Sequence, residues 1–378
     1  MSQAAAGPQL SDRQRLHWLR LIRTPNVGPA SFRDLVNRFG SAETAIEMLP
    51  EVMRAGGTQR SVRIPSVAEA EAELEAARRF GARFVAIGEA DYPPMLRRMD
   101  HPPPLLALKG TAAVLHLPPV AIVGARNASL AGIKMARTLA AELGRNGYAV
   151  ISGLARGIDT AAHHGSLDTG TVGVLAGGLD RPYPPENSDL CDEIASRGAI
   201  VSEMPFGWEP RAQDFPRRNR IVAGLALGLV VVEAATRSGS LISARLAAEL
   251  GRLVFAVPGS PLDPRAAGTN GLLKEGATLV TDASDVIEAL APLAGGELPA
   301  TPPKVEEPPD FAAAPPPAEG DRARIVEALG PVPVEVDELI RHTGLHPAQI
   351  FMVLLELDLA GRLERHSGGR VSLVTPDD

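Results

Sequence analysis

The sequence predicts an α/β fold: a Rossmann-like, doubly wound, mostly parallel sheet with a helical module before it and a winged-helix module after it. Three observations lead to this prediction. Short apolar runs alternate with helical patterns over residues 105–290, helical patterns dominate the first hundred residues, and the segment from 321 onward reads as three helices and a hairpin. A chain of 378 residues that is 45% apolar can form two or three domains.

Residues 1–82 are expected to form the helical module. Ser11 or Asp12 can cap the first helix, and a turn over residues 24–29 precedes an amphipathic stretch that stops at Gly40. Helix, glycine turn and helix resemble the helix–hairpin–helix of the SAM-like class. Such a hairpin either contacts the DNA backbone or only packs, and both interpretations stay open. A further helix is expected over 67–80.

Residues 83–296 are expected to form the sheet domain. The strand candidates are Arg83–Ile87, Leu105–Leu108, Val120–Val123, Ala149–Ser152, Val172–Ala176, Ala199–Ser202, Leu229–Glu233 and Leu253–Val257. Helical patterns cover Gly132–Asn146, Ile158–Thr169, Ser188–Arg197, Ile221–Leu227 and Leu241–Leu250. Continuously apolar strands separated by helices indicate a parallel sheet covered on both faces.

A linker and a small module end the chain. Residues 297–320 contain eight prolines and are expected to be a semi-extended linker. Residues 321–378 read as helices over 322–329, 336–343 and 347–360, followed by a hairpin, which is a winged-helix pattern. The third helix, the recognition-helix candidate, has two acidic and no basic residues, so we expect it to bind protein or nothing rather than duplex DNA.

Composition excludes several classes of protein. No run of 18 uncharged apolar residues can span a membrane, and the start lacks a signal-peptide pattern, so a cytoplasmic protein is expected. Cys191 is the only cysteine, which excludes an internal disulfide or a cysteine-based metal centre, and no metal is expected. The net charge of −7 does not indicate a nucleic-acid binder, but residues 211–220 concentrate four arginines.

Five strand ends lead into loops of small residues, which begin at Gly124, Ser152, Gly177, Glu233 and Pro258. The carboxyl ends of parallel strands meet at one edge of the sheet, where ligands of such folds bind. Glycine allows close approach, and free N–H groups at a helix start attract phosphate. We therefore expect a phosphate-bearing ligand at this edge.

The first of these loops is not a dinucleotide fingerprint. Arg126 stands where GxGxxG requires its second glycine, and a guanidinium there would crowd a pyrophosphate but can hold a single phosphate. The chain also lacks GxxxxGK[ST]. Neither NAD binding nor P-loop ATP hydrolysis is supported, and no cofactor is expected.

The segment Phe215–Arg220 combines three arginines with an aromatic ring and is placed just before the apolar helix 221–227. A phosphate clamp with a stacking face suits single-stranded nucleic acid. The alternative is an exposed basic helix start, with Phe215 anchoring the loop in the core.

No catalytic constellation is found. Ser238-Gly239-Ser240 lacks a nearby base to activate a nucleophile, so its hydroxyls suit phosphate binding better. Asp159 and His163 share an i,i+4 spacing that favours a helix-stabilising pair over a metal or acid–base pair. We predict that the chain is not an enzyme.

Several motifs, taken in order, resemble the DprA family of DNA-processing proteins. They are Val120–Arg126, Ser152–Asp159, Phe215–Arg220, Ser238–Leu241 and Gly268–Ala277. The resemblance is specific over 105–290 and looser for the two flanking modules. It implies a protein that binds single-stranded DNA without cutting it, protects it during natural transformation, loads the RecA recombinase and dimerises through the Rossmann-like domain.

The resemblance and the loops together give the expected site. The residues expected to bind DNA are Gly124, Arg126, Ser129, Gly153, Phe215, Arg217, Arg218, Asn219, Arg220, Ser238, Gly239 and Ser240. Leu272, Leu273 and Lys274 are expected at the homodimer interface. Replacing Arg126, or Arg218 together with Arg220, by alanine is expected to weaken DNA binding and to leave the melting temperature almost unchanged, because each change removes charge-assisted phosphate contacts.

Two alternative functions stay open. One is an enzyme acting on a phosphorylated nucleotide, of the lysine-decarboxylase-like phosphoribohydrolase type. Its PGGxGTxxE loop supplies a catalytic glutamate, whereas residues 237–244 of this chain contain none. The other is a winged-helix transcription regulator, which the acidic recognition-helix candidate disfavours.

Overall fold

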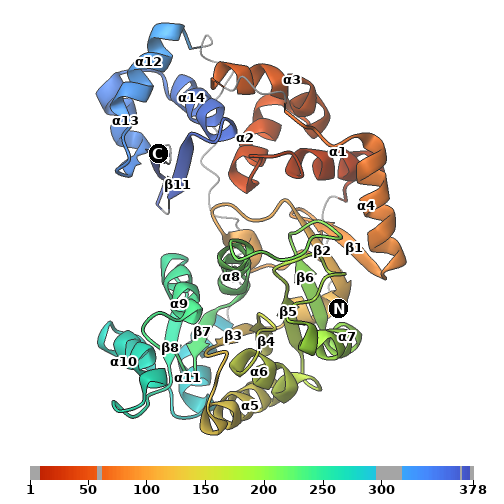
Figure 1. Cartoon of the computed structure of the whole chain (residues 1–378), viewed down its shortest axis with the longest axis vertical. Coiled ribbons are helices and arrows are strands. Elements are labelled where there is room, and N and C mark those ends of the chain that lie inside the picture. The colour runs from red at the N-terminus through yellow and green to blue at the C-terminus, as the bar shows by residue number, and fades with distance from the viewer. Residues whose placement is uncertain (1–8, 58–61, 295–316, 367, 375–378) are drawn as a thin grey trace. The chain divides into compact units, whose positions relative to one another are not determined.

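The computed structural model describes residues 9–57, 62–294, 317–366 and 368–374 (Figure 1). These form two compact units. Of the described residues, 9 and 72–294 belong to one unit, and those within 10–71 and 317–374 belong to the other. The expected proline-rich linker lies outside the described residues except for its last four positions.

The first unit contains a nine-stranded sheet with the order β1-β2-β6-β5-β4-β3-β7-β8-β9. The strands are β1 (Ala82–Ala86), β2 (Leu105–Gly110), β3 (Pro119–Val123), β4 (Ala149–Ser152), β5 (Thr171–Val174), β6 (Ala199–Ser202), β7 (Gly228–Val231), β8 (Leu253–Ala256) and β9 (Thr278–Leu279). β2 pairs antiparallel with β1 and β6, and the other pairs are parallel. The predicted mostly parallel sheet is confirmed.

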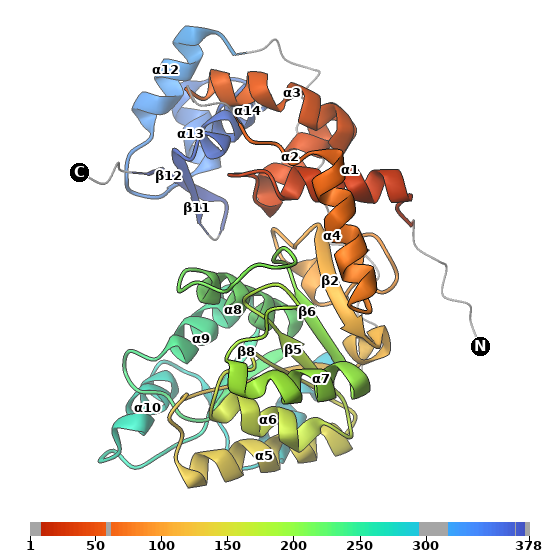
Figure 2. The same cartoon turned by 45° about the vertical axis from the view of Figure 1, so that its right-hand side comes forward.

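Helices cover both faces of this sheet. They are α5 (Leu130–Arg145), α6 (Ile158–Ser166), α7 (Ser188–Arg197), α8 (Asp214–Leu225), α9 (Gly239–Glu249), α10 (Ala267–Lys274) and α11 (Ala283–Ala294). The boundary between the two units falls within α4 (Val67–Arg79). In β3, Val120 and Ile122 join the core with α5, α6 and α11, whereas Ala121 and Val123 join the core with α8 and α9. Successive side chains alternate between the faces. Figure 2 shows α5 and α6 lying together.

The strand order reverses beside β3. The chain moves from β3 to β4, β5 and β6 on one side, then returns to place β7 and β8 on the other side. Ligands of doubly wound folds bind at such a switch point, outside the carboxyl ends of the strands. The loops after β3 and β7 flank this point.

The second unit combines both ends of the chain. The N-terminal part contains α1 (Asp12–Ile22), α2 (Pro29–Phe39) and α3 (Ala42–Ala55), and the C-terminal part contains α12 (Glu319–Ala328), β10 (Val334–Glu335), α13 (Val336–Thr343), α14 (Pro347–Leu359), β11 (Leu363–His366) and β12 (Arg370–Leu373). The predicted helical module and winged helix are confirmed. The elements that were not predicted from the sequence are α3, α10, α11 and the two-residue strands β9 and β10.

Local chemistry explains where the N-terminal helices begin and end. Ser11 accepts a hydrogen bond from the Gln14 amide and closes a capping box at the start of α1. Pro29 occupies the first turn of α2, where its missing N–H has no cost. Gly40 ends α2 at φ +76°, a left-handed conformation that favours glycine.

The α14 helix lies between two cores of this unit, and none of its side chains is exposed. Leu354 and Leu357 belong to the winged-helix core, while Leu355 and Leu359 belong to the core of α1, α2 and α3. Figure 1 shows α14 beside α2 and α3. Such an apolar helix is buried on all sides. Among the described residues, no helix has the length and apolar character needed to cross a membrane.

Candidate nucleic-acid interface

Two guanidinium groups lie against the Phe215 ring at the carboxyl edge of the sheet. Arg126 follows β3 and is exposed, and its guanidinium carbon lies 5.3 Å from the centre of the Phe215 ring. The guanidinium carbon of Arg218 lies 5.7 Å from the same centre. Both distances are within the range of cation–π attraction. Residues that are far apart in the sequence therefore meet at Phe215.

Tyr183 is a member of this group that the sequence analysis missed. Its ring packs edge-to-face on Phe215 with centroids 5.6 Å apart, and the residue is 48% exposed. Tyr183 could have been singled out from the sequence, because it follows a predicted strand in a chain with only 4% aromatic residues. We call Arg126, Tyr183, Phe215 and Arg218 the Phe215 cluster.

The segment Phe215–Arg220 lies within α8 rather than before a helix, which corrects the predicted placement. Asp214 is the first residue of α8, and its carboxylate accepts a hydrogen bond of 2.8 Å from the Arg211 amide, which precedes the helix. Each residue of a helix is rotated by about 100° from the previous one. Arg217 and Arg220 consequently share one side of α8, and Arg218 points elsewhere.

Arg217 and Arg220 are both paired with Glu203, which follows β6. Arg217 Nε lies 2.9 Å and Arg220 Nη2 lies 2.7 Å from the Glu203 carboxylate, and Arg220 also donates to the His101 carbonyl oxygen at 2.9 Å. Glu203 is buried. The expectation of one open arginine clamp is wrong, because an internal acid binds two of its three members.

Arg218 is buried, with only 7% of its surface exposed. Its guanidinium donates to the carbonyl oxygens of Gly153 and Val174, the latter at 3.1 Å, and its Nε donates to Asn219. A Cβ on Gly153 would collide with this guanidinium, so the close approach requires glycine. Arg218 thus ties α8 to the ends of β4 and β5.

Asp159 is a buried acid whose charge interacts with that of Arg218. Its carboxylate accepts hydrogen bonds from the Gly153 and Ala155 amides at 3.2 and 3.3 Å. Burial raises the pKa of Asp159, and the positive charge of Arg218 opposes that rise. Burial also lowers the pKa of Arg218, while Asp159 opposes the fall. Because Arg218 is buried and hydrogen-bonded, we now expect its removal to destabilise the fold, in contrast to the sequence-based expectation of an almost unchanged melting temperature.

His163, the other member of the i,i+4 pair, has a different partner. Its Nδ1 lies 2.7 Å from the Thr171 hydroxyl, and burial lowers its pKa to about 3. The two side chains of the supposed pair therefore bind separate groups. Within the described ranges, no cluster of histidine, cysteine and acidic residues could hold a metal ion.

Glu233 occupies the start of α5, where a phosphate was expected. Ser129 caps this helix by accepting from the Gly132 amide at 2.9 Å, and its hydroxyl donates to the Glu233 carboxylate. The Ser129 amide donates to the same carboxylate at 2.9 Å. A half-buried protein acid, rather than a vacant set of N–H groups, faces Ser129.

The remaining predicted residues have varied surroundings. Ser238 caps α9, and its hydroxyl lies 2.7 Å from that of Ser240. Gly239 is exposed, whereas a Cβ on Gly124 would come within 2.6 Å of the Ile158 side chain. In α10, Leu272 packs partly on the core, Leu273 is half-buried and Lys274 is exposed.

Fold and site together define a class of protein: a Rossmann-like α/β protein with helix–hairpin–helix and winged-helix modules and a cationic, aromatic cluster at its switch-point edge. The family model for DNA recombination-mediator protein A matches residues 83–291. The DprA-like N-terminal HHH domain matches 12–76, and the DprA winged helix domain matches 307–369. The chain belongs to the DprA family.

Known proteins agree with this assignment. Protein Smf of Escherichia coli is 38% identical over 285 residues, covering 75% of each chain. The crystal structure of DprA from Streptococcus pneumoniae is 37% identical with a TM-score of 0.56, and the match covers 66% of this chain and 82% of that one. A structure addressing the single-stranded DNA binding mode of Helicobacter pylori DprA is 31% identical, with a TM-score of 0.52 and coverages of 56% and 97%.

Proposed function

We propose that this protein binds single-stranded DNA without sequence preference, protects it, and loads RecA onto it in natural transformation and recombination. The observation that carries the proposal is the Phe215 cluster at the switch-point edge of a DprA-family sheet. Aromatic rings stack on any base, and a guanidinium neutralises phosphate without reading sequence.

Arg126 is the phosphate-binding group of this proposal. It is exposed beside an aromatic ring, and no acidic residue in the described part of the chain forms an ion pair with it. Arg217 and Arg220, paired with Glu203, contribute less positive charge. Phe215 and Tyr183 supply stacking surface, and the buried guanidinium of Arg218 supports the Phe215 ring.

No catalytic step is part of this function. The phosphoribohydrolase alternative requires a glutamate in the loop that here reads Arg237–Ala244, and none is present. The serine hydroxyls of that loop bind each other at the start of α9. A transcription regulator would need an exposed recognition helix, whereas α14 has no exposed side chain.

Two partners are part of the proposal besides DNA and RecA. A second copy of the chain binds through the Rossmann-like domain near Leu272, Leu273 and Lys274. The protein partner of the winged helix is the N-terminal module of the same chain: Asn26 donates to the Leu359 carbonyl oxygen at 3.0 Å, and Arg365 lies 3.0 Å from Asp34.

Fluorescence anisotropy with oligo-dT and a matched duplex, across a salt series, tests the proposal. We expect preference for the single strand and a steep loss of affinity with salt. Arg126→Ala should lose about 1.5–3 kcal/mol of binding free energy with little change in melting temperature, because it removes charge-assisted phosphate contacts from an exposed position.

Arg145→Ala is the matched control. Arg145 is exposed at the other end of α5, at the amino edge of the sheet, and its removal should not change the affinity. Equal binding of the single strand by wild type and Arg126→Ala would refute the site, and equal affinity for duplex and single strand would refute the substrate.

A further inference from the structure

A second aromatic–guanidinium pair lies in the loop after β6. The Arg211 guanidinium carbon lies 4.6 Å from the centre of a Trp208 ring. Arg211 is exposed and Trp208 is half-buried. Neither residue belongs to the Phe215 cluster, and the proposed site above does not use them. We call this pair the Trp208 platform.

Backbone contacts place the Trp208 platform on the same sheet edge as the Phe215 cluster. The Gly178 amide donates to the Trp208 carbonyl oxygen at 3.0 Å, which joins the loops after β5 and β6. The first of these loops continues to Tyr183, whose ring contacts Phe215. A Cβ on Gly177 would come within 2.7 Å of the same Trp208 oxygen, so the two loops are in close contact.

A buried carboxylate sets the orientation of the indole. Trp208 Nε1 donates to Asp214 at 2.9 Å, and Asp214 is only 4% exposed. The same carboxylate accepts from the Arg211 amide and directly precedes Phe215. Asp214 therefore holds the indole in place before any ligand arrives, which lowers the entropic cost of binding.

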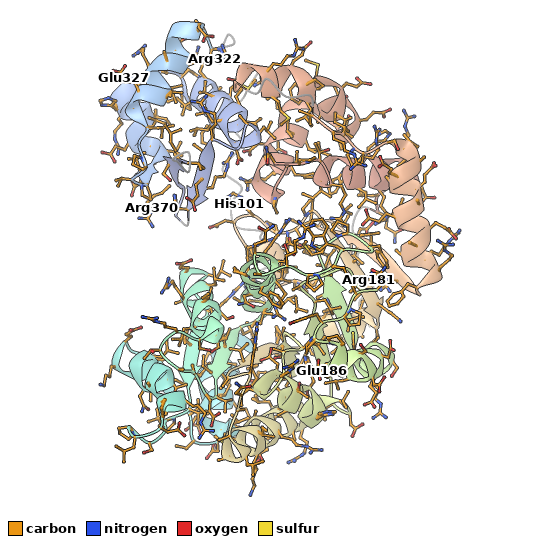
Figure 3. All side chains as sticks on the ribbon, in the orientation of Figure 1. His101, Arg181, Glu186, Arg322, Glu327 and Arg370 are labelled. Atoms are coloured by element: carbon orange, nitrogen blue, oxygen red, sulfur yellow. The ribbon has the colours of Figure 1, made fainter. Side chains whose placement is uncertain are left out.

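The charge of Arg211 is available to a ligand. The nearest acid in sequence, Glu209, lies 3.3 Å from Arg181 instead (Figure 3 labels Arg181). In the described part of the chain, the Arg211 side chain forms no ion pair, and its guanidinium lies against the indole. A guanidinium supported in this way can stack on a base through its outer face and donate its N–H groups to phosphate.

We propose that the Trp208 platform is a second nucleotide subsite for single-stranded DNA; this rests on the proposed function. In the strand order, β5 and β4 separate β6 from β3, so the two ends of the track are three strand spacings apart. Three spacings are roughly 14 Å, a span of a few nucleotides. The strand would run along the sheet edge from Arg126 over Phe215 to Trp208.

The chain contains two tryptophans, Trp18 and Trp208, which makes the subsite directly observable. In the Trp18→Phe variant of the full chain, Trp208 is the only tryptophan reporter. Titration with oligo-dT of increasing length should change its emission in parallel with anisotropy, and only oligonucleotides long enough to span both clusters should do so. Arg211→Glu should weaken oligo-dT binding about fivefold or more.

Two controls accompany this measurement. Arg145→Glu carries the same charge reversal at the opposite sheet edge and should bind at least several-fold better than Arg211→Glu. A matched duplex should leave Trp208 emission unchanged.

The outcomes separate the two proposals. Anisotropy that reports tight binding, together with constant Trp208 emission and wild-type affinity of Arg211→Glu, would overturn the subsite and leave the proposed function standing. Failure of the wild-type protein to bind oligo-dT at all would overturn the proposed function itself. A duplex that changes Trp208 emission as strongly as oligo-dT would overturn the single-strand assignment.

Discussion

Arg126 and Arg218 touch the same phenylalanine ring yet have opposite roles. Arg126 is exposed and can meet a phosphate, whereas Arg218 is buried and hydrogen-bonded to two strand ends. A buried charge is stable only when it is paired and hydrogen-bonded. The contrast explains why an arginine-rich motif is not by itself a binding surface.

Arg218→Ala is expected to lower the free energy of unfolding by about 1–3 kcal/mol, because the buried carbonyl oxygens of Gly153 and Val174 lose their donor and Asp159 loses the positive charge that opposes the rise of its pKa. Urea denaturation at neutral pH measures this loss. The double variant Arg218→Ala with Asp159→Asn should recover part of it, since the uncompensated charge is gone. An Arg218→Ala variant as stable as the wild type would contradict the stabilising role of Arg218.

His163 predicts how stability depends on pH. Its pKa is lowered from the ordinary 6.5 to about 3, chiefly by burial and further by His164 and Arg218. Between these values the unfolded chain binds the extra proton, so stability falls as pH falls below about 6.5, by up to about 1.4 kcal/mol per pH unit. The raised pKa of Asp159 acts in the opposite direction.

His163→Gln isolates the histidine contribution. Between pH 6.5 and pH 5 the wild type should lose up to about 2 kcal/mol more than this variant in urea denaturation. The variant keeps Asp159, so the difference between the two slopes belongs to His163. Parallel slopes would show that His163 is protonated in the folded state.

At the scale of elements, α8 and α14 decide what the surface offers. In α8 the helical rotation sends Arg217 and Arg220 to Glu203 and Arg218 inward. In α14 apolar side chains join two cores, and the N-terminal helices cover the side that its own module leaves open. The acidic, apolar character of α14 in the sequence was the signal for this burial.

Arg365→Glu tests the contact between α14 and the N-terminal helices. Arg365 lies 3.0 Å from Asp34 and 2.9 Å from Asp358, so the substitution places three acids together. Hydrogen exchange of α2 and α14 amides in the full chain should become roughly tenfold faster, equivalent to about 1.4 kcal/mol. Arg341→Glu, at an exposed position of α13, should leave these rates unchanged.

The charge-reversed pair Asp34→Arg with Arg365→Asp should restore slow exchange, because it rebuilds one of the two ion pairs. Fast exchange of α14 in the wild type, or unchanged rates in Arg365→Glu, would refute the N-terminal module as the partner of the winged helix.

At the scale of the whole molecule, three family domains form two compact units, because the first and last segments of the chain pack together. The sheet unit carries the Phe215 cluster and the Trp208 platform. The other unit encloses its recognition helix. We therefore propose that the sheet unit alone contacts DNA.

Leu273→Lys tests the proposed homodimer. Leu273 is half-buried on α10, and a charge at an apolar contact should convert the dimer to a monomer in sedimentation velocity. Leu293→Lys on α11 is the control, since Leu293 is 44% exposed and lies outside the proposed interface. Equal sedimentation of wild type and Leu273→Lys would refute the interface.

The elements of the sheet unit were largely predictable, because strands and helices follow from local apolar periodicity. Every strand from β1 to β8 was located to within a few residues. The exceptions have separate reasons. β9 and β10 have two residues each, too few to show a period, and α8 starts at Asp214, ahead of the apolar stretch from Ile221 that predicted a helix.

The site was less predictable, because it depends on pairs of residues that are distant in the chain. Glu203 pairs with two arginines 14 and 17 residues away, and Glu233 accepts hydrogen bonds from Ser129 across 104 residues. Tyr183 and Trp208 stand in loops without a motif. Exposure and ion pairing are properties of the folded neighbours and leave no mark on a single segment.

The order of motifs and the alternation of apolar runs thus determined the family and the layered architecture without help from the structure. Tertiary packing alone decided which guanidinium faces solvent, which acid each arginine meets and what covers α14. The physical reason is that hydrophobic periodicity is local, whereas burial and electrostatic pairing depend on which distant segments the fold brings together.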